Sequence, residues 1–147
     1  MGMYTELVLS VELRKERPAN VIPVLTYLIN GEGDEPTDLP DHPFFEKRRW
    51  RMVGRGSSYY FANPEPIGRL HLGNITKTYH FTMWCNLKNY QGEIEAFCDW
   101  LAPYVHTWGR EILGWTRYEE EDVPTLIAFG PDGVEFINVP IPAESFG

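Results

Sequence analysis

Cysteine is scarce in this sequence, and long apolar runs are missing. The two cysteines, Cys85 and Cys98, form neither a metal-binding spacing nor a Cys-x-x-Cys pair, so the pattern predicts neither a thiolate metal site nor a redox pair. No apolar run approaches the roughly 20 residues that a membrane-spanning helix requires. The N-terminus also lacks the basic segment followed by an apolar stretch that marks a secretory signal. We therefore expect a cytoplasmic protein with no membrane association.

Basic residues are outnumbered by acidic ones. The sequence has 13 Lys and Arg against 21 Asp and Glu, which gives a formal net charge of -8 at pH 7. A field of this sign repels phosphate backbones and anionic lipid surfaces at long range. Generic nucleic-acid binding is therefore disfavoured, and basic or neutral partners are favoured.

One basic segment departs from this balance. Residues 47–55 carry five cations and follow an acidic segment, 31–43, that holds five acidic residues and three prolines. The simplest interpretation is that 47–55 is a strand whose charges the acidic segment neutralises across the surface. The alternative is a nucleic-acid patch in which Trp50 is a stacking platform. Segment 31–43 itself is predicted to be a mobile, solvated loop.

Catalytic and metal-binding motifs are also missing. The four histidines show no spacing that brings two metal ligands together on one helix or strand. The acidic run at 119–122 lacks the alternating ligands and the glycine of a calcium loop. The glycine stretches at 54–56 and 130–133 are not followed by a helix start that would hold a phosphate. The sequence therefore predicts no metal and no cofactor.

What the chain does have is enough apolar surface to build a core. Of its 147 residues, 43% are hydrophobic and 14% are aromatic. That length and composition predict one folded domain, residues 1–147, that needs neither disulfides nor metal for stability. We expect an irregular tail at 140–147, where two prolines interrupt any regular element.

Hydrophobic periodicity predicts the order of the elements. Alternation at 4–14 indicates a strand with one buried face, and helical spacing indicates helices that begin after Asn20 and span 91–102. Further strands are predicted at 57–62, 67–72, 75–87, 111–118, 125–129 and 134–139. The sequence thus predicts an α+β domain with a mostly antiparallel sheet and both helices packed on one face. This order resembles a ferredoxin-like plan with extra hairpins, a resemblance of topology that implies no function.

The strand predicted at 75–87 carries the most informative pattern. One side is apolar and is expected to be buried in the core. The other side carries hydrogen-bonding groups and one large aromatic: Thr78, His80, Thr82, Trp84 and Asn86. Two helices cover only one face of such a sheet, so the opposite face meets solvent, a partner or a ligand. Because an exposed Trp often anchors an interface, we predict that these residues form a binding surface.

These features favour a small acidic interaction or regulatory protein that binds a macromolecular partner or its own copy. A protein partner or a homo-oligomer is therefore expected. The alternative is a small-molecule enzyme or ligand-binding domain centred on His80. The residues from His80 to Met83 resemble half of the paired His-x-Thr signature of the two-histidine phosphoesterases. The second half is missing, because His71 lacks the hydroxyl and the threonine after His106 comes one residue too early.

Overall fold

The computed structural model describes residues 3–30, 34–58 and 60–140 of the chain. Its strands are β1 Thr5–Glu12, β2 Ile67–Leu72, β3 Tyr79–Leu87, β4 Glu111–Tyr118, β5 Thr125–Gly130 and β6 Gly133–Asn138. Its α-helices are α1 Val21–Asn30 and α2 Glu93–Leu101. Its short 3₁₀ segments are η1 Pro43–Glu46, η2 Trp50–Met52 and η3 Ala102–Tyr104. The predicted α+β class is confirmed.

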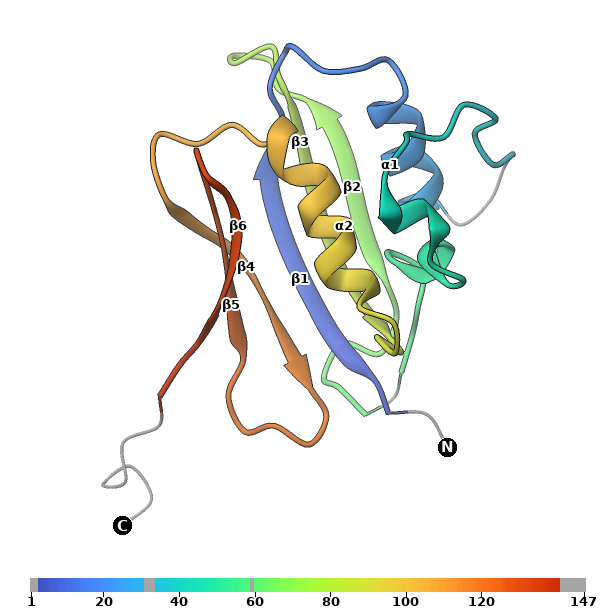
Figure 1. Ribbon diagram of the computed structural model, residues 1–147, viewed down its shortest axis with the longest axis vertical. Coiled ribbons are helices and arrows are strands. Elements are labelled where there is room, and N and C mark those ends of the chain that lie inside the picture. Colours follow the sequence, from blue (N-terminus) through green and yellow to red (C-terminus); the bar gives the residue numbers. More distant parts are fainter. Residues whose placement is uncertain (1–2, 31–33, 59, 141–147) are drawn as a thin grey trace.

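All the strand pairs are antiparallel, and the sheet has the order β2-β3-β1-β4-β5-β6. The first strand of the chain therefore lies inside the sheet, between β3 and β4 (Figure 1). β5 and β6 follow β4 directly and continue the sheet to its far edge. This is not the standard ferredoxin plan, because β1 and β3 are antiparallel where a split βαβ pair is parallel, and because β5 and β6 extend the sheet beyond β4.

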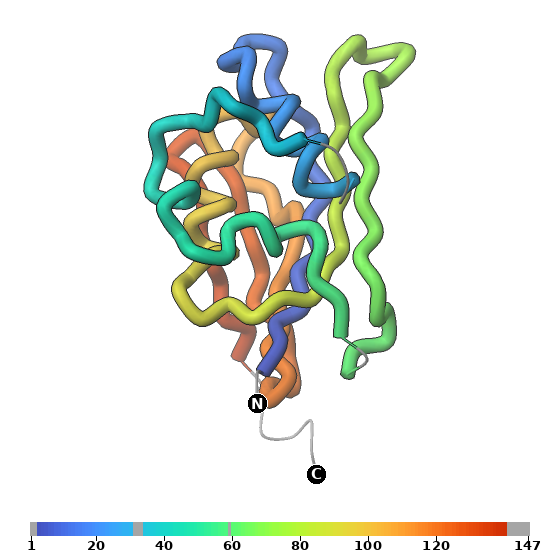
Figure 2. Tube along the Cα trace, turned by 90° about the vertical axis from the view of Figure 1, so that its right-hand side faces the viewer, coloured from blue at the N-terminus to red at the C-terminus, as the bar shows by residue number. Residues whose placement is uncertain are grey.

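Both α-helices lie in front of the same face of the sheet in Figure 1, and Figure 2 shows the helical segments on one side of the β2–β3 hairpin. The core fills the space between these helices and the sheet. It includes six residues that the strand and helix patterns placed there: Leu9, Val11, Leu25, Phe81, Met83 and Phe97. The predicted burial of one face of the sheet under two helices is confirmed. No helix within the described ranges is long and apolar enough to cross a membrane.

Helix α1 packs closely against the edge strand β2. A Cβ atom built on Gly68 would lie 2.6 Å from the Cβ of Ile29. Any side chain at this position would push the helix away from the strand, so only glycine permits this approach.

Residues 47–55 do not form the predicted strand. They contain η2 and turns, and the Trp50 side chain within η2 is only 1% exposed. Its ring packs edge-on against Phe44 and Phe45, with ring centroids 5.9 and 5.0 Å away. Burial of these aromatic rings outweighs the exposure favoured by the neighbouring charges. Trp50 is therefore not a stacking platform for nucleic acid.

The described part of the acidic segment, residues 34–43, is attached to neighbouring elements. Glu35 forms an ion pair with Arg51, and the Arg51 guanidinium lowers the pKa of the Glu35 carboxyl. His42 Nε2 lies 2.9 Å from Asp99 Oδ2 on α2. The acidic segment thus neutralises the basic one at Arg51. Residues 31–33 lie outside the described residues, and mobility of the loop stays a prediction.

The strand predicted at 57–62 is absent from the described residues, and the predicted start of the strand at 75–87 is wrong. Residues 57–66, apart from the undescribed Tyr59, contain no strand, because a proline-rich sequence at 63–66 carries the chain away from the sheet. β3 begins at Tyr79, since Gly73 and Thr78 close a turn in which the Gly73 amide donates to the Thr78 carbonyl at 2.8 Å. Ile75, which shares the parity of the core residues, is consequently 95% exposed. Most of the predicted tail, 141–147, lies outside the described residues.

Candidate functional site

The face of the sheet opposite the helices carries the residues that the sequence pattern singled out. His80, Thr82, Trp84 and Asn86 alternate along β3 with the buried Phe81, Met83 and Cys85. Thr78 precedes the strand, in the turn that connects it to β2. We call this side of the sheet the uncovered face. The five predicted residues lie in three different environments along it.

Trp84 lies on the uncovered face of β3, the second strand in the sheet, and is half-buried. Its backbone pairs with Ile67 on β2 and with Val8 on β1, and Val8 in turn pairs with Trp115 on β4. Trp115 pairs with Leu126 on β5, which pairs with Ile137 on β6. Directly paired residues of neighbouring strands lie side by side on the same face. One apolar residue from each strand therefore contributes to a continuous line, the apolar row: Ile67, Trp84, Val8, Trp115, Leu126 and Ile137.

Five of the six side chains in the apolar row are half-buried, and Ile67 at its β2 end is 54% exposed. Beside the row, Ile112 lies next to the bulge in β4, pairs with Ala128 and is 56% exposed. Water-facing strands of antiparallel sheets usually alternate apolar and polar residues, with the polar set outside. This face instead has an apolar centre.

Trp84 is tied to a buried carboxylate on the adjacent strand. Its Nε1 donates to Glu6 Oε2 at 2.8 Å, and Glu6 is 2% exposed. The other oxygen, Oε1, lies 3.6 Å from Arg117 Nη2 on β4. A buried charge needs such partners, since an unpaired one is costly. Trp84 therefore stabilises the fold through a hydrogen bond to Glu6, and it also belongs to the apolar row.

Asn86 is covered by the irregular segment 57–66. Its Nδ2 donates to the Asn63 carbonyl at 2.8 Å, and the residue is fully buried. Phe61 of the same segment is buried beneath the guanidinium of Arg117, which lies 5.2 Å from its ring centroid. This end of the predicted binding surface is therefore closed to a partner in this structure.

The opposite end is polar. The Thr78 hydroxyl donates to Glu12 Oε2 at 2.7 Å, and Thr82 shares a 3.0 Å hydrogen bond with Ser10. His80 Nε2 lies 3.2 Å from the Thr76 hydroxyl. These hydrogen bonds give each hydroxyl group a partner within the chain. The polar end is therefore a strand surface whose side chains are bonded to one another.

His80 has a second imidazole beside it. The His71 and His80 rings stack with centroids 5.3 Å apart and planes 24° from parallel. Burial lowers the pKa of His71, and the positive charge of Arg69 and the neighbouring His80 act in the same direction. A phosphoesterase pair must place two imidazoles on either side of a substrate, whereas stacked rings leave no space between them. Among the described residues, no cluster of three His, Cys, Asp or Glu side chains is arranged to hold a metal ion.

Sequence reasoning missed most of the apolar row. It found Trp84 but not Ile67, Val8, Trp115, Leu126 or Ile137, because few apolar residues lie on the outward side of any one strand. The signal that could have been used was the recurrence of an outward apolar residue in all six strands. Comparison with known proteins gives no match to a family model, to a curated protein or to a solved structure.

Proposed function

We propose that this chain is an interaction protein rather than an enzyme, and that it binds a second copy of itself through the apolar row. The observation that supports the proposal is the row's continuity across the whole sheet. Exposed apolar surface that is contiguous and bordered by polar groups is typical of protein interfaces. Tryptophan at the centre of such a surface is a frequent source of binding energy.

The row is complementary to itself. A two-fold axis that runs parallel to the strands, between β1 and β4, exchanges β1 with β4, β3 with β5 and β2 with β6 of the second copy. Val8 then lies opposite Trp115 of the second copy. Trp84 lies opposite Leu126 of the second copy, and every apolar residue meets another. Such a symmetric interface closes on itself as a dimer.

Charges beside the row fit the same axis. On one flank, Glu6 on β1 and Arg117 on β4 already pair within the same copy, and Glu6 is buried, so this flank presents no unbalanced charge to the second copy. On the other flank, Arg69 pairs with Thr82 on β3, and Glu135 pairs with Ala128 on β5. The axis directs Arg69 toward Glu135 of the second copy. The uncovered face is thus balanced in charge, although the chain as a whole is acidic.

Sedimentation velocity over a range of protein concentrations tests the proposal. Wild type should pass from monomer to dimer as concentration rises. Ile67→Lys combined with Ile112→Lys should weaken the dimer by about tenfold or more, because both residues would bring an unpaired charge into the contact. Ile75→Lys is the matched control, since Ile75 is 95% exposed in the turn before β3. It should leave dimerisation unchanged, and a wild type that stays monomeric throughout contradicts the proposal.

A charge exchange tests the direction of the axis. Arg69→Glu and Glu135→Lys should each weaken the homodimer, because each places like charges opposite one another. Mixing the two single variants should restore association, since each substituted residue then meets an opposite charge. If a substitution acted only by damaging the fold of its own variant, mixing the two variants would not restore association. Failure of the mixture to associate would reject this axis.

The effect of ionic strength on the complex distinguishes self-association from the binding of a basic partner. Two copies with a net charge of -8 repel each other, and salt screens that repulsion. Added salt should therefore strengthen the dimer. Binding of a basic partner would weaken under the same conditions, so a salt-weakened complex argues against the second copy as occupant.

A further inference from the structure

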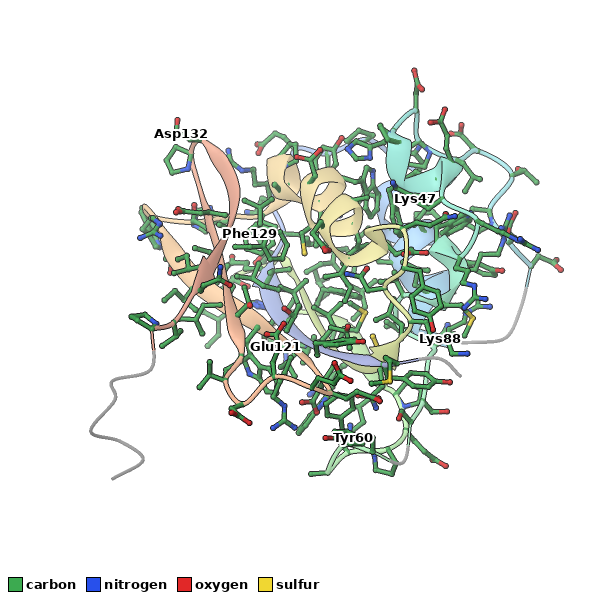
Figure 3. All side chains as sticks on the ribbon, turned by 60° about the horizontal axis from the view of Figure 1, so that its bottom comes forward. Lys47, Tyr60, Lys88, Glu121, Phe129 and Asp132 are labelled. Carbon is green, nitrogen blue, oxygen red and sulfur yellow. The ribbon has the colours of Figure 1, made fainter. Side chains whose placement is uncertain are left out.

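A cavity of about 530 Å³ lies where the start of β1, the end of β3 and the η2 segment meet. Its volume is within the range of small-molecule sites. Five cationic side chains line it: Arg48, Arg49, Arg51, Arg55 and Lys88. Figure 3 shows Lys88 on the side of the molecule where the η1–η2 segment lies, with Asp132 at the opposite side. We call this cavity the cationic pocket, and it is separate from the apolar row.

Few of these cations are neutralised. Within the described residues, Arg51 pairs with Glu35, whereas Arg48, Arg49 and Lys88 have no carboxylate within ion-pair distance. Arg55 donates to the Tyr27 carbonyl at 2.7 Å, but its Nε is buried without a hydrogen-bond partner in the same part of the chain. The pocket therefore retains several positive charges whose N–H groups can donate hydrogen bonds to a ligand.

This arrangement is unusual for an acidic chain. With 21 carboxylates in the sequence, acidic partners are abundant, and the five cations nevertheless gather around one cavity. Like charges held close together repel each other, and a buried unsatisfied donor adds a desolvation cost. A bound anion would offset the repulsion between the cations.

We propose that the cationic pocket binds a small organic phosphate that carries at least two negative charges. Guanidinium groups match phosphate oxygens with paired hydrogen bonds, and a single carboxylate would neutralise only one of the unpaired cations. The pocket also has apolar walls for the organic part of the ligand. Met52 is 44% exposed, and the Tyr4 ring lies beneath the Lys88 ammonium at 5.5 Å.

The same observations favour a small ligand over a nucleic-acid strand. The cations surround a cavity instead of forming a track across the surface. Trp50, the aromatic residue within the basic segment, is buried and cannot stack on bases. The overall negative charge also repels a long phosphate backbone.

Calorimetric titration at low salt tests the proposal with four probes: pyrophosphate, ADP, citrate and a short thymidine oligomer. ADP and pyrophosphate should each saturate one site per chain. Arg48→Gln combined with Lys88→Gln should weaken ADP binding by about tenfold or more. Lys15→Gln combined with Lys77→Gln removes the same charge at positions that do not line the pocket and should leave binding unchanged.

A second measurement locates the site without any substitution. Amide NMR shifts caused by ADP should concentrate at Gly56, Ser57 and Lys88, which line the pocket. Absence of saturable binding by both phosphates overturns the proposal, as does an equal loss of affinity in the control variant. Citrate binding as tight as that of ADP would reject phosphate as the ligand class. Oligomer binding that pyrophosphate does not displace would reject a small ligand.

Discussion

The indole of Trp84 is the hydrogen-bond donor that holds the carboxylate of Glu6, 2.8 Å away, on the neighbouring strand. Glu6 is almost completely buried, so no water replaces this donor without a change in structure. The indole of Trp84 is therefore held by a buried charge beside it on the same face of the sheet.

Trp84→Phe should lower the free energy of unfolding by about 1.5 to 3 kcal/mol, the usual value of a hydrogen bond to a charged group. The ring remains, but Glu6 loses its indole donor. Urea denaturation measures the loss. Trp108→Phe is the matched control, because Trp108 is 90% exposed and should have little effect. Equal stability of the two variants would show that the Glu6 bond contributes nothing.

Gly114→Ala should disrupt the pairing of β1 with β4. A Cβ at this position would lie 2.2 Å from the Val8 carbonyl oxygen, which is backbone and cannot rotate away. We expect a loss of about 1 to 3 kcal/mol or more from this overpacking. Gly109→Ala meets no atom within 4 Å and should be nearly neutral. Thermal denaturation compares the two, and similar melting temperatures would contradict the close contact at Gly114.

The stability of the fold should decrease as the pH falls through the range where free histidine titrates. The pKa of His71 is lowered from its ordinary value of 6.5, chiefly by burial, so the unfolded chain takes up this proton more readily than the folded one. The stabilising contribution is complete above pH 6.5 and is lost as pH falls toward the lowered value. His71→Gln should flatten this dependence in urea denaturation at a series of pH values.

The stacked partner provides an independent check. His80→Gln removes a neighbouring charge, so the pKa of His71 should rise when followed by NMR. An unchanged value would show that the two rings do not interact electrostatically.

Neither thiol should react in the native protein. Burial raises the pKa of Cys85 to about 12, and burial with the nearby Glu95 and Asp99 raises that of Cys98 as well. Only the thiolate is an effective nucleophile, so labelling by a disulfide reagent at mildly alkaline pH should wait for unfolding. The labelling rate should then rise with urea in parallel with loss of the native signal. Rapid labelling without denaturant would contradict complete burial.

The core was predictable because its signal is local. Leu9 and Val11 on β1 are separated by Ser10, and Phe81 and Met83 on β3 are separated by Thr82, and the structure buries the four apolar residues together. Trp50 shows the limit of this reasoning. Its arginine neighbours suggest exposure, and only the distant aromatic rings that surround it explain its burial.

The candidate site was harder to predict from the sequence, because it depends on the register in which the strands pair. Val8 and Trp115 are 107 positions apart in numbering and become neighbours only through the pairing of β1 with β4. A bulge between Ile112 and Gly114 changes the parity of β4, so alternation alone cannot assign its faces. The burial of Asn86 likewise depends on a loop, 57–66, whose path has no periodic signal.

The position of β1 inside the sheet has a consequence for biosynthesis. β1 is synthesised before both of its partner strands, since Thr5 pairs with Leu87 on one side and with Tyr118 on the other. Neither edge of this apolar strand is satisfied until most of the chain has been translated. Nascent chains that stop before β4 therefore display an unpaired strand edge, which is a template for aggregation.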